Sequence, residues 1–156
     1  MNTYSKKKSK TKFFKISMIK HGTEFEDDKK LREHIINEAG ENSISAGQLI
    51  EVLKNKSCAE NIELIEGDIT VTLPEYVRSN PELKISLLNL DTDIYEPSVT
   101  ILEELYPKIV SGGILILDDY KVFPGETKAV DDYFAGMNIE IKKFPFSATP
   151  CYIVKK

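Results

Sequence analysis

The chain has 156 residues, of which 41% are hydrophobic and 29% are charged. This composition is typical of one soluble globular domain and excludes disordered, collagen-like and membrane-spanning chains. No apolar run approaches the roughly 18 to 20 residues that cross a bilayer, and no apolar stretch follows the early lysines to make a secretory signal. The two cysteines, Cys58 and Cys151, lie too far apart for a disulfide framework or the usual zinc spacings, so we expect a cytoplasmic protein.

The net charge of −4 hides an uneven distribution of charged residues. Residues 1–23 hold seven lysines and no acid, which leaves 14 basic against 25 acidic side chains in residues 24–156. Because phosphate binding needs clustered cations, the acidic body argues against nucleic acid as a ligand. We interpret residues 1–23 as a weakly structured basic leader, a solvated tail rather than an RNA or membrane contact, in which Phe13 and Phe14 would allow one docking strand. Residues 24–156 are expected to form a single α/β domain.

The spacing of apolar residues predicts the elements in chain order. Helices are expected at 26–39 and 45–56, the second capped by Ser45 and burying an apolar side made of Leu49, Ile50, Val52 and Leu53. From residue 62 strands and helices alternate, with strands at 62–66, 85–90 and 114–117 and helices at 73–78, 98–110 and 126–135. The last of these helices starts at Glu126, which favours the positive end of the helix dipole. Segments 139–143 and 151–154 predict an antiparallel hairpin.

This alternation predicts a doubly wound, Rossmann-like α/β sheet with right-handed crossovers and a C-terminal antiparallel hairpin. The strand at 85–90 is mostly apolar, as expected of a strand that is covered on both faces. Gly112 and Gly113 are expected to end the preceding helix and to open the strand that begins at Ile114. Ligands of such a sheet bind beyond the carboxyl ends of its strands, which makes the residues there the first candidates for function.

Acidic side chains follow two successive strands where each strand ends: Asp91 and Asp93 after one, Asp118 and Asp119 after the other. If the strands are neighbours about 5 Å apart, these carboxylates converge and repel one another unless a cation or bound protons neutralise them. Oxygen ligands without His or Cys nearby favour Mg²⁺ over zinc. The alternative is that each acid is a turn residue or a helix cap. Two clusters on consecutive strands favour the metal site.

Four ordered motifs carry a resemblance to a known family: LLNLDTDIYEP at 87–97, LYPK at 105–108, GGILILDDY at 112–120 and KAVDDY at 128–133. They resemble the macrocin O-methyltransferase family, whose members use S-adenosylmethionine and Mg²⁺ to methylate sugar hydroxyls. The resemblance covers residues 60–135 and the final hairpin in outline, and it fades before residue 45. It implies a class I methyltransferase-type sheet and a sugar-containing small-molecule substrate, namely a glycoside, a nucleotide-sugar-derived natural product or a surface glycan.

Carried over by position, the resemblance places the metal ligands on Asp91, Asp118 and Asp119 and the general base on Asp93. The chemistry agrees with this division. A metal that binds the substrate's hydroxyls lowers their pKa, and a carboxylate within hydrogen-bond reach can take the proton as the methyl group is transferred. Residues 123–126 resemble a loop over the active site in related deoxyhexose methyltransferases, with the helix start at Glu126 as the alternative.

The cofactor side of the resemblance is incomplete. Gly67 and Asp68 end an earlier strand where related methyltransferases contact the adenine, with a simple turn as the alternative for Asp68. The fold normally adds a glycine-rich loop after its first strand, yet no Gly-x-Gly arrangement precedes residue 60. We therefore expect a domain that lacks the first β-α-β unit and is incomplete at its N-terminal side. The leader, direct closure of the sheet, a second copy or a partner chain would then cover the exposed edge.

Three functions follow from these patterns. The first is an S-adenosylmethionine- and Mg²⁺-dependent sugar O-methyltransferase, or an inactive truncated form of one. The second is a non-catalytic Rossmann-like module that has lost cofactor binding, which the missing glycine loop favours. The third is a Mg²⁺-dependent phosphotransfer or hydrolase domain. The lack of a phosphate loop and of an activating lysine argues against it.

Overall fold

The computed structural model describes residues 11–15, 24–39 and 45–156. The rest of the predicted leader and the expected helix end at Gly40 lie outside the described residues. In chain order the elements are β1 (Thr11–Lys15), α1 (Glu26–Ala39), α2 (Ala46–Asn55), β2 (Ile62–Glu66), α3 (Ile69–Ser79), β3 (Ile85–Leu90), α4 (Tyr95–Leu105), a 3₁₀ turn at Tyr106–Lys108, β4 (Ile109–Leu117), α5 (Pro124–Tyr133), β5 (Lys142–Lys143) and β6 (Cys151–Val154). None of the described helices has the length and apolar character that a membrane span requires.

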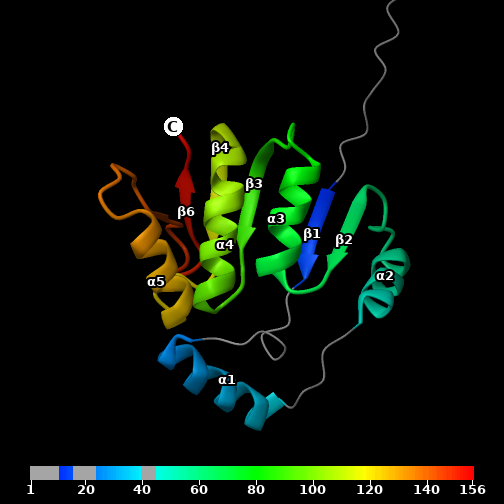
Figure 1. The fold of residues 1–156 in the computed structure, drawn as a ribbon, viewed down its shortest axis with the longest axis horizontal. Coiled ribbons are helices and arrows are strands. Elements are labelled where there is room, and N and C mark those ends of the chain that lie inside the picture. Colours follow the sequence, from blue (N-terminus) through cyan, green and yellow to red (C-terminus); the bar gives the residue numbers. More distant parts are fainter. Residues whose placement is uncertain (1–10, 16–23, 40–44) are drawn as a thin grey trace, which may run out of the picture.

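The strands form an open α/β arrangement, which confirms the predicted fold class. β1 pairs with β2 in parallel, and a second ladder has the order β3-β4-β6-β5, in which β3 and β4 are parallel and the β5–β6 hairpin is antiparallel. Helices α3, α4 and α5 lie side by side in front of the sheet, and β1 lies between β2 and β3 (Figure 1). β1, a strand from the predicted leader, thus lies next to β3 at the edge that was expected to be exposed.

The hydrophobic core lies between these three helices and the sheet. Along β4 the alternate residues Leu115 and Leu117 are fully buried on the helix side, whereas Ile114 and Ile116 on the other side are only half-buried. The prediction that the strand at 85–90 is covered on both faces is wrong. Leu90 is buried, but Leu87 is 58% exposed, because the described helices α3 to α5 pack on one face of the sheet.

Helix α2 confirms one expectation and corrects another. The Ser45 side chain accepts a hydrogen bond from the Gln48 backbone N–H, and the Gln48 side chain accepts one from Ser45 N–H, which makes a capping box. The apolar side that was expected to be buried is not: α2 has no buried residue, and Ile50 and Val52 are 39% and 45% exposed. Periodicity predicts an apolar face, but it does not show whether a neighbour covers that face.

Several element ends differ from the prediction for local reasons. Helix α3 begins at Ile69 because Asp68 caps it, and α4 begins at Tyr95 and stops at Leu105. Strand β4 starts at Ile109 and runs through the two glycines instead of starting after them. A Cβ on Gly113 would lie 2.6 Å from Ile109 Cγ2 and 3.1 Å from Ser86 O, so glycine permits the close approach of β3 and β4.

Candidate functional site

The four predicted acids lie beyond the carboxyl ends of two adjacent parallel strands. Leu90, the last residue of β3, is the register partner of Leu117, the last residue of β4. The Asp118 backbone N–H donates to Leu90 O at 3.0 Å and continues the ladder one residue further. The loops that carry the acids therefore leave the sheet side by side, as the sequence predicts.

Three of these acids converge on one point. Asp91, Asp93 and Asp119 each offer a carboxylate oxygen, and the three oxygens all lie within 4.8 Å of one another. Asp118 is not in this group, although its charge acts on both Asp91 and Asp93. In the described part of the chain, this is the group of side chains with the spacing of metal ligands. We call Asp91, Asp93, Asp118 and Asp119 the acid cluster.

Asp93 has an uncommon backbone conformation. Its φ is +62°, and the Ile94 N–H closes a three-residue turn onto the Thr92 carbonyl at 2.6 Å. A non-glycine residue in the left-handed region carries a conformational cost, so neighbouring contacts must hold it there. The turn aims the Asp93 carboxylate into the cluster and not along the strand direction.

Burial and mutual repulsion raise the pKa values of the cluster. Burial, followed by a hydrogen bond with Asp119 and by the charges of Asp119, Asp91 and Asp118, raises the pKa of Asp93 to about 7. Burial, followed by neighbouring carboxylates, also raises the pKa of Asp91 and Asp118. The cluster therefore needs protons or a cation near neutral pH.

The donor chemistry fits a hard divalent cation. The three convergent groups offer carboxylate oxygens, two from half-buried side chains and one from the exposed Asp91. Oxygen donors of this kind are the ligands that Mg²⁺ prefers, and Asp91 on the exposed side leaves room for water or substrate in the remaining positions.

A fifth acid, Glu126, joins the two loops and was missed as a site residue by the sequence analysis. It is the third residue of α5 and is 0% exposed. Its backbone N–H donates to Asp93 O at 3.2 Å, and its side-chain Oε1 accepts from the Asp119 backbone N–H at 3.0 Å. Burial raises the pKa of Glu126 to about 8 against the lowering effect of the backbone donors. The available signals were its place seven residues after Asp119 and the resemblance of residues 123–126 to an active-site loop.

The start of helix α1 docks beside this site. Asp28 is 0% exposed, and its Oδ2 accepts a hydrogen bond from the Tyr95 backbone N–H at 2.7 Å, at the start of α4. The Asp28 carboxyl also lies against Gly125 in the first turn of α5, where any Cβ would collide with it. The Glu24 backbone N–H reaches Glu96 Oε1 at 2.7 Å. The start of α1 thus approaches the two helices that begin beyond the acid-bearing loops (Figure 1).

The predicted cofactor residues lie on another loop, after β2. Gly67 has a φ of +137°, and a Cβ there would lie 2.7 Å from Thr72 Cγ2. The Asp68 carboxylate accepts hydrogen bonds from Thr70 N–H at 2.9 Å and Thr70 Oγ1 at 2.7 Å, and so caps α3. The turn is thus shaped by its own contacts, in agreement with the turn alternative for Asp68, and its role toward a cofactor stays a prediction.

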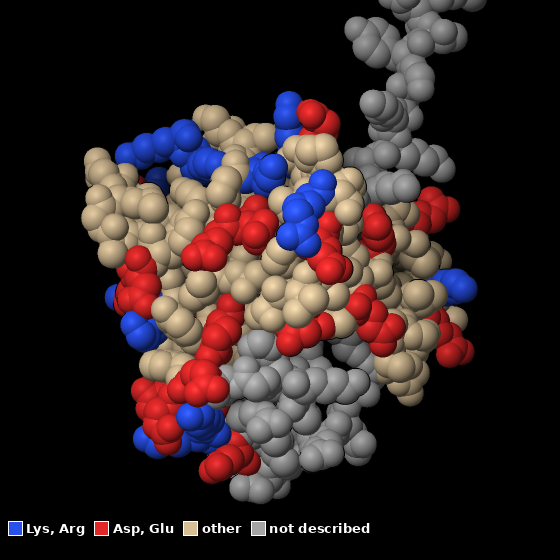
Figure 2. Space-filling model, viewed as in Figure 1, with Lys and Arg blue, Asp and Glu red and all other residues tan. Residues whose placement is uncertain are grey.

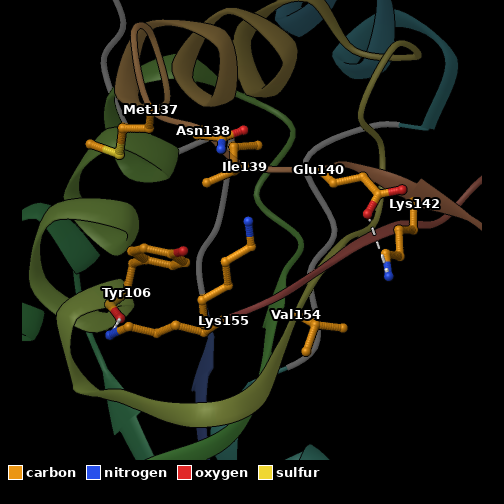
Figure 3. A pocket seen from close by; sticks show the side chains of 9 residues that line it. Tyr106, Met137, Asn138, Ile139, Glu140, Lys142, Val154 and Lys155 are labelled. Atoms are coloured by element: carbon orange, nitrogen blue, oxygen red, sulfur yellow. Dashed lines mark hydrogen bonds and ion pairs between the residues drawn. The ribbon is translucent and has the colours of Figure 1, made fainter.

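A pocket of about 430 Å³ lies at the opposite end of β4 from the acids (Figure 3). Its lining includes Tyr106, Ile139 and Val154. Lys155 Nζ donates to the carbonyls of Tyr106 and Pro107 at 2.9 and 3.1 Å, where it satisfies the end of the α4 segment. Figure 2 shows several basic side chains together near the end of the molecule where the C-terminus lies, and acids with further basic side chains over the rest of that face. Glu140 is the one acid among its lining residues, so this pocket has no group of converging carboxylates.

The sequence matches one protein family over most of its length. The family described as macrocin-O-methyltransferase (TylF) matches residues 15–148. Demethyldecarbamoylnovobiocin O-methyltransferase from Streptomyces niveus is 36% identical over 80 residues, which make up 51% of this chain and 29% of that protein. A Streptomyces olivaceus enzyme, 8-demethyl-8-(2,3-dimethoxy-alpha-L-rhamnosyl)-tetracenomycin-C 4'-O-methyltransferase, is 32% identical over 74 residues, or 47% and 26% of the two chains.

Solved structures show the same fold. The O-methyltransferase NovP superposes with a TM-score of 0.77 over 94% of this chain and 60% of its own, at 24% identity. The apo structure of CalS11, described as a TDP-rhamnose 3'-O-methyltransferase of calicheamicin biosynthesis, gives a TM-score of 0.63 at 28% identity, covering 72% of this chain and 54% of its own. The matches thus span less than a third of these curated relatives and 54–60% of these solved chains.

Proposed function

Because the chain belongs to the macrocin-O-methyltransferase family, we propose that it is an S-adenosylmethionine-dependent methyltransferase acting on a sugar hydroxyl. The relatives support the substrate class, since the names of two of them include a rhamnosyl group and TDP-rhamnose. The observation that carries the proposal is the convergence of three carboxylates within 4.8 Å beyond β3 and β4.

We assign the roles within the acid cluster as follows. Asp91 and Asp119, whose carboxylate oxygens converge, would hold Mg²⁺ together with Asp118, which lies outside the convergent group and is assigned as a ligand by the resemblance; when bound, Mg²⁺ would supply positive charge that acidifies a sugar hydroxyl. Asp93 is the base. Its carboxylate oxygen lies within 4.8 Å of those of Asp91 and Asp119, and burial raises its pKa, which favours proton uptake by this group.

The proposed step moves the methyl group to the substrate oxygen and the hydroxyl proton to Asp93. S-adenosylmethionine supplies the methyl group on a positively charged sulfur. The substrate hydroxyl gives its proton to Asp93 as its oxygen bonds to the methyl carbon, and the carbon–sulfur bond breaks to leave a neutral thioether. The strained turn at Asp93 fixes the base in place before substrate arrives, so little reorganisation is needed in the transition state. Gly67 and Asp68, at the end of β2, are the proposed contacts to the cofactor's adenine.

The division between ligand and base is tested by two matched variants. Asp93→Asn should keep Mg²⁺ affinity and lower the methyl-transfer rate about 10²- to 10⁴-fold, as expected for loss of a general base. Asp118→Asn, one residue from Asp119, should weaken Mg²⁺ binding and raise the Mg²⁺ concentration needed for half-maximal rate. The opposite pattern would make Asp93 the ligand and reject this assignment.

The activity itself is tested by incubating the full chain with methyl-labelled S-adenosylmethionine and TDP-rhamnose as acceptor, with Mg²⁺ or with EDTA. Label in the sugar only with Mg²⁺ is the expected result. A folded protein that neither binds S-adenosylmethionine nor transfers label would favour the second candidate, a non-catalytic Rossmann-like module. The specific observation behind that candidate is the lack of a Gly-x-Gly arrangement before residue 60.

A further inference from the structure

Glu126 is a buried acid to which neither the resemblance nor the proposed mechanism assigns a chemical role, although it lies in the segment that resembles an active-site loop. Two of its groups form hydrogen bonds outside α5. The backbone N–H donates to the Asp93 carbonyl at 3.2 Å, and the side-chain Oε1 accepts from the Asp119 N–H at 3.0 Å. The side chain is 0% exposed, and its Oε2 makes no hydrogen bond within the described part of the chain. One residue of α5 therefore contacts both loops of the acid cluster.

Burying this carboxyl costs solvation free energy, and an interaction with the dipole of its own helix does not explain why it is buried. A glutamate in the first turn interacts favourably with the helix dipole while it remains in solvent. An acid that is buried with one oxygen unbonded loses solvation that a solvent-exposed position would keep. The hydrogen bond that Oε1 makes goes to Asp119, outside α5, so the side chain serves the loop after β4 and not its own helix.

We propose that Glu126 is the positioning residue of the acid cluster, which sets the separation of Asp93 and Asp119 by binding one loop through its main chain and the other through its side chain. The inference rests on the proposed function, because that separation is also the distance between the base and a metal ligand. Asp93 stands in a strained left-handed turn, which is the kind of conformation that needs an external contact to persist.

Two substitutions separate reach from charge. Glu126→Gln keeps the length of the side chain and an oxygen that can accept from Asp119, but it removes the carboxylate. Glu126→Asp keeps the carboxylate near the start of α5 but is one methylene too short to reach Asp119. Val130→Ala is the control, because Val130 is also 0% exposed on α5 and offers no polar group to the loops.

The experiment measures Mn²⁺ binding to the full chain by electron paramagnetic resonance, with Mg²⁺ as competitor. Glu126→Asp should weaken binding about 10- to 100-fold, as loss of a residue that orients a ligand typically does, whereas Glu126→Gln should stay within about threefold of wild type. Val130→Ala should lower the midpoint of thermal unfolding without changing Mn²⁺ affinity. Hydrogen exchange at the Asp119 amide should speed up in Glu126→Asp alone.

The reverse order, with Glu126→Gln impaired and Glu126→Asp intact, would overturn the inference and assign the residue a role through its charge. Equal Mn²⁺ affinity in all variants would also overturn it. If wild type binds no Mn²⁺, the metal part of the proposed function fails. The Asp119 amide then decides the inference by itself: equal protection in both Glu126 variants would reject it, and loss of protection in Glu126→Asp alone would support it.

Discussion

Residues 69–153 and the described residues before them differ in the contacts that hold them in the fold. The buried hydrophobic side chains among the residues whose burial is described all lie between Ile69 and Ile153, while α2 has none. The start of α1 is attached through two hydrogen bonds, from the Tyr95 N–H to Asp28 and from the Glu24 N–H to Glu96, and through a ring contact between Phe25 and Tyr95. The C-terminal part thus has its own core, and the upstream elements dock onto it.

The acid cluster and the proposed cofactor contacts lie in differently packed parts of the chain. The acid cluster follows β3 and β4, whose last residues, Leu90 and Leu117, are fully buried in the hydrophobic core. The proposed cofactor contacts lie after β2, whose residues are at best half-buried. Metal binding should therefore be the more robust property of this chain, and cofactor binding the more easily lost.

Truncating the core should give the largest effect. Leu102→Ala removes a fully buried side chain of α4 and should lower the free energy of unfolding by about 3–5 kcal/mol. Ile50→Ala on the exposed side of α2 should change it by less than about 0.5 kcal/mol. Urea unfolding followed by circular dichroism checks both, and comparable losses would contradict the contrast between the two regions.

Adding one methyl group should have opposite effects at two glycines. Gly125→Ala forces a Cβ into the Asp28 carboxyl and should destabilise the protein by about 1–3 kcal/mol. Gly47→Ala in α2 meets only Ser45 Oγ at 3.8 Å and should stabilise the protein by about 0.5–1 kcal/mol. Adding Asp28→Ala to Gly125→Ala should cost less than the two separate losses combined; strict additivity would show that the docking contact does not form.

The acid cluster predicts the pH dependence of stability without metal. The folded-state pKa of Asp93 is about 7 against an ordinary value of 3.8, so the folded protein keeps a proton that the unfolded chain releases. The contribution of these acids to stability should therefore be fully present below about pH 4 and should be lost as the pH rises to about 7 for Asp93 and to about 8 for Glu126, whose pKa is also raised. In EDTA the thermal midpoint should drop by a few degrees from pH 5 to pH 8.

Mg²⁺ and a variant provide the controls for this pH effect. Mg²⁺ should restore the thermal midpoint at pH 8 more than at pH 5, because protons compete with the cation for the carboxylates. Asp93→Asn should show a smaller fall with pH in EDTA. A midpoint that rises from pH 5 to pH 8 would mean that the cluster does not hold protons as described.

The smallest effect is expected at the capping box of α2. Ser45→Ala removes the acceptor for the Gln48 N–H and should cost about 1 kcal/mol of local helix stability. Because α2 buries no residue, the loss should appear as faster hydrogen exchange within 46–55 and not in the core strands. Slower folding or a global loss of stability would show that α2 contributes to the core.

Short-range patterns in the sequence predicted the order of the elements, the helix cap at Ser45 and the acids of the cluster. Apolar runs and turn residues gave the order of the elements, and the cap at Ser45 was readable because its partner lies three residues away. The acids of the cluster were found because each follows its strand directly. These are short-range patterns, for which a single sequence carries enough information.

The features that were missed depend on contacts between distant residues. The burial of Glu126 and Asp28, and the uncovered faces of α2 and β3, depend on which elements meet in space. The strand β4 was placed too late because the two glycines look like a turn, whereas Gly113 is needed for contact with Ser86 on β3. None of these contacts leaves a periodic pattern in the chain.

The central claim is that the carboxylates beyond β3 and β4 form a magnesium site. Calorimetric titration of Mg²⁺ into the full chain at pH 8 tests it most directly, comparing wild type with Asp91→Asn/Asp119→Asn. The pair Asp131→Asn/Asp132→Asn, exposed on α5, is the control with the same change of charge. Saturable binding at one site is expected in wild type and in the control, and none in the cluster variant. Absence of binding in wild type, or equal binding in all three proteins, would contradict the claim.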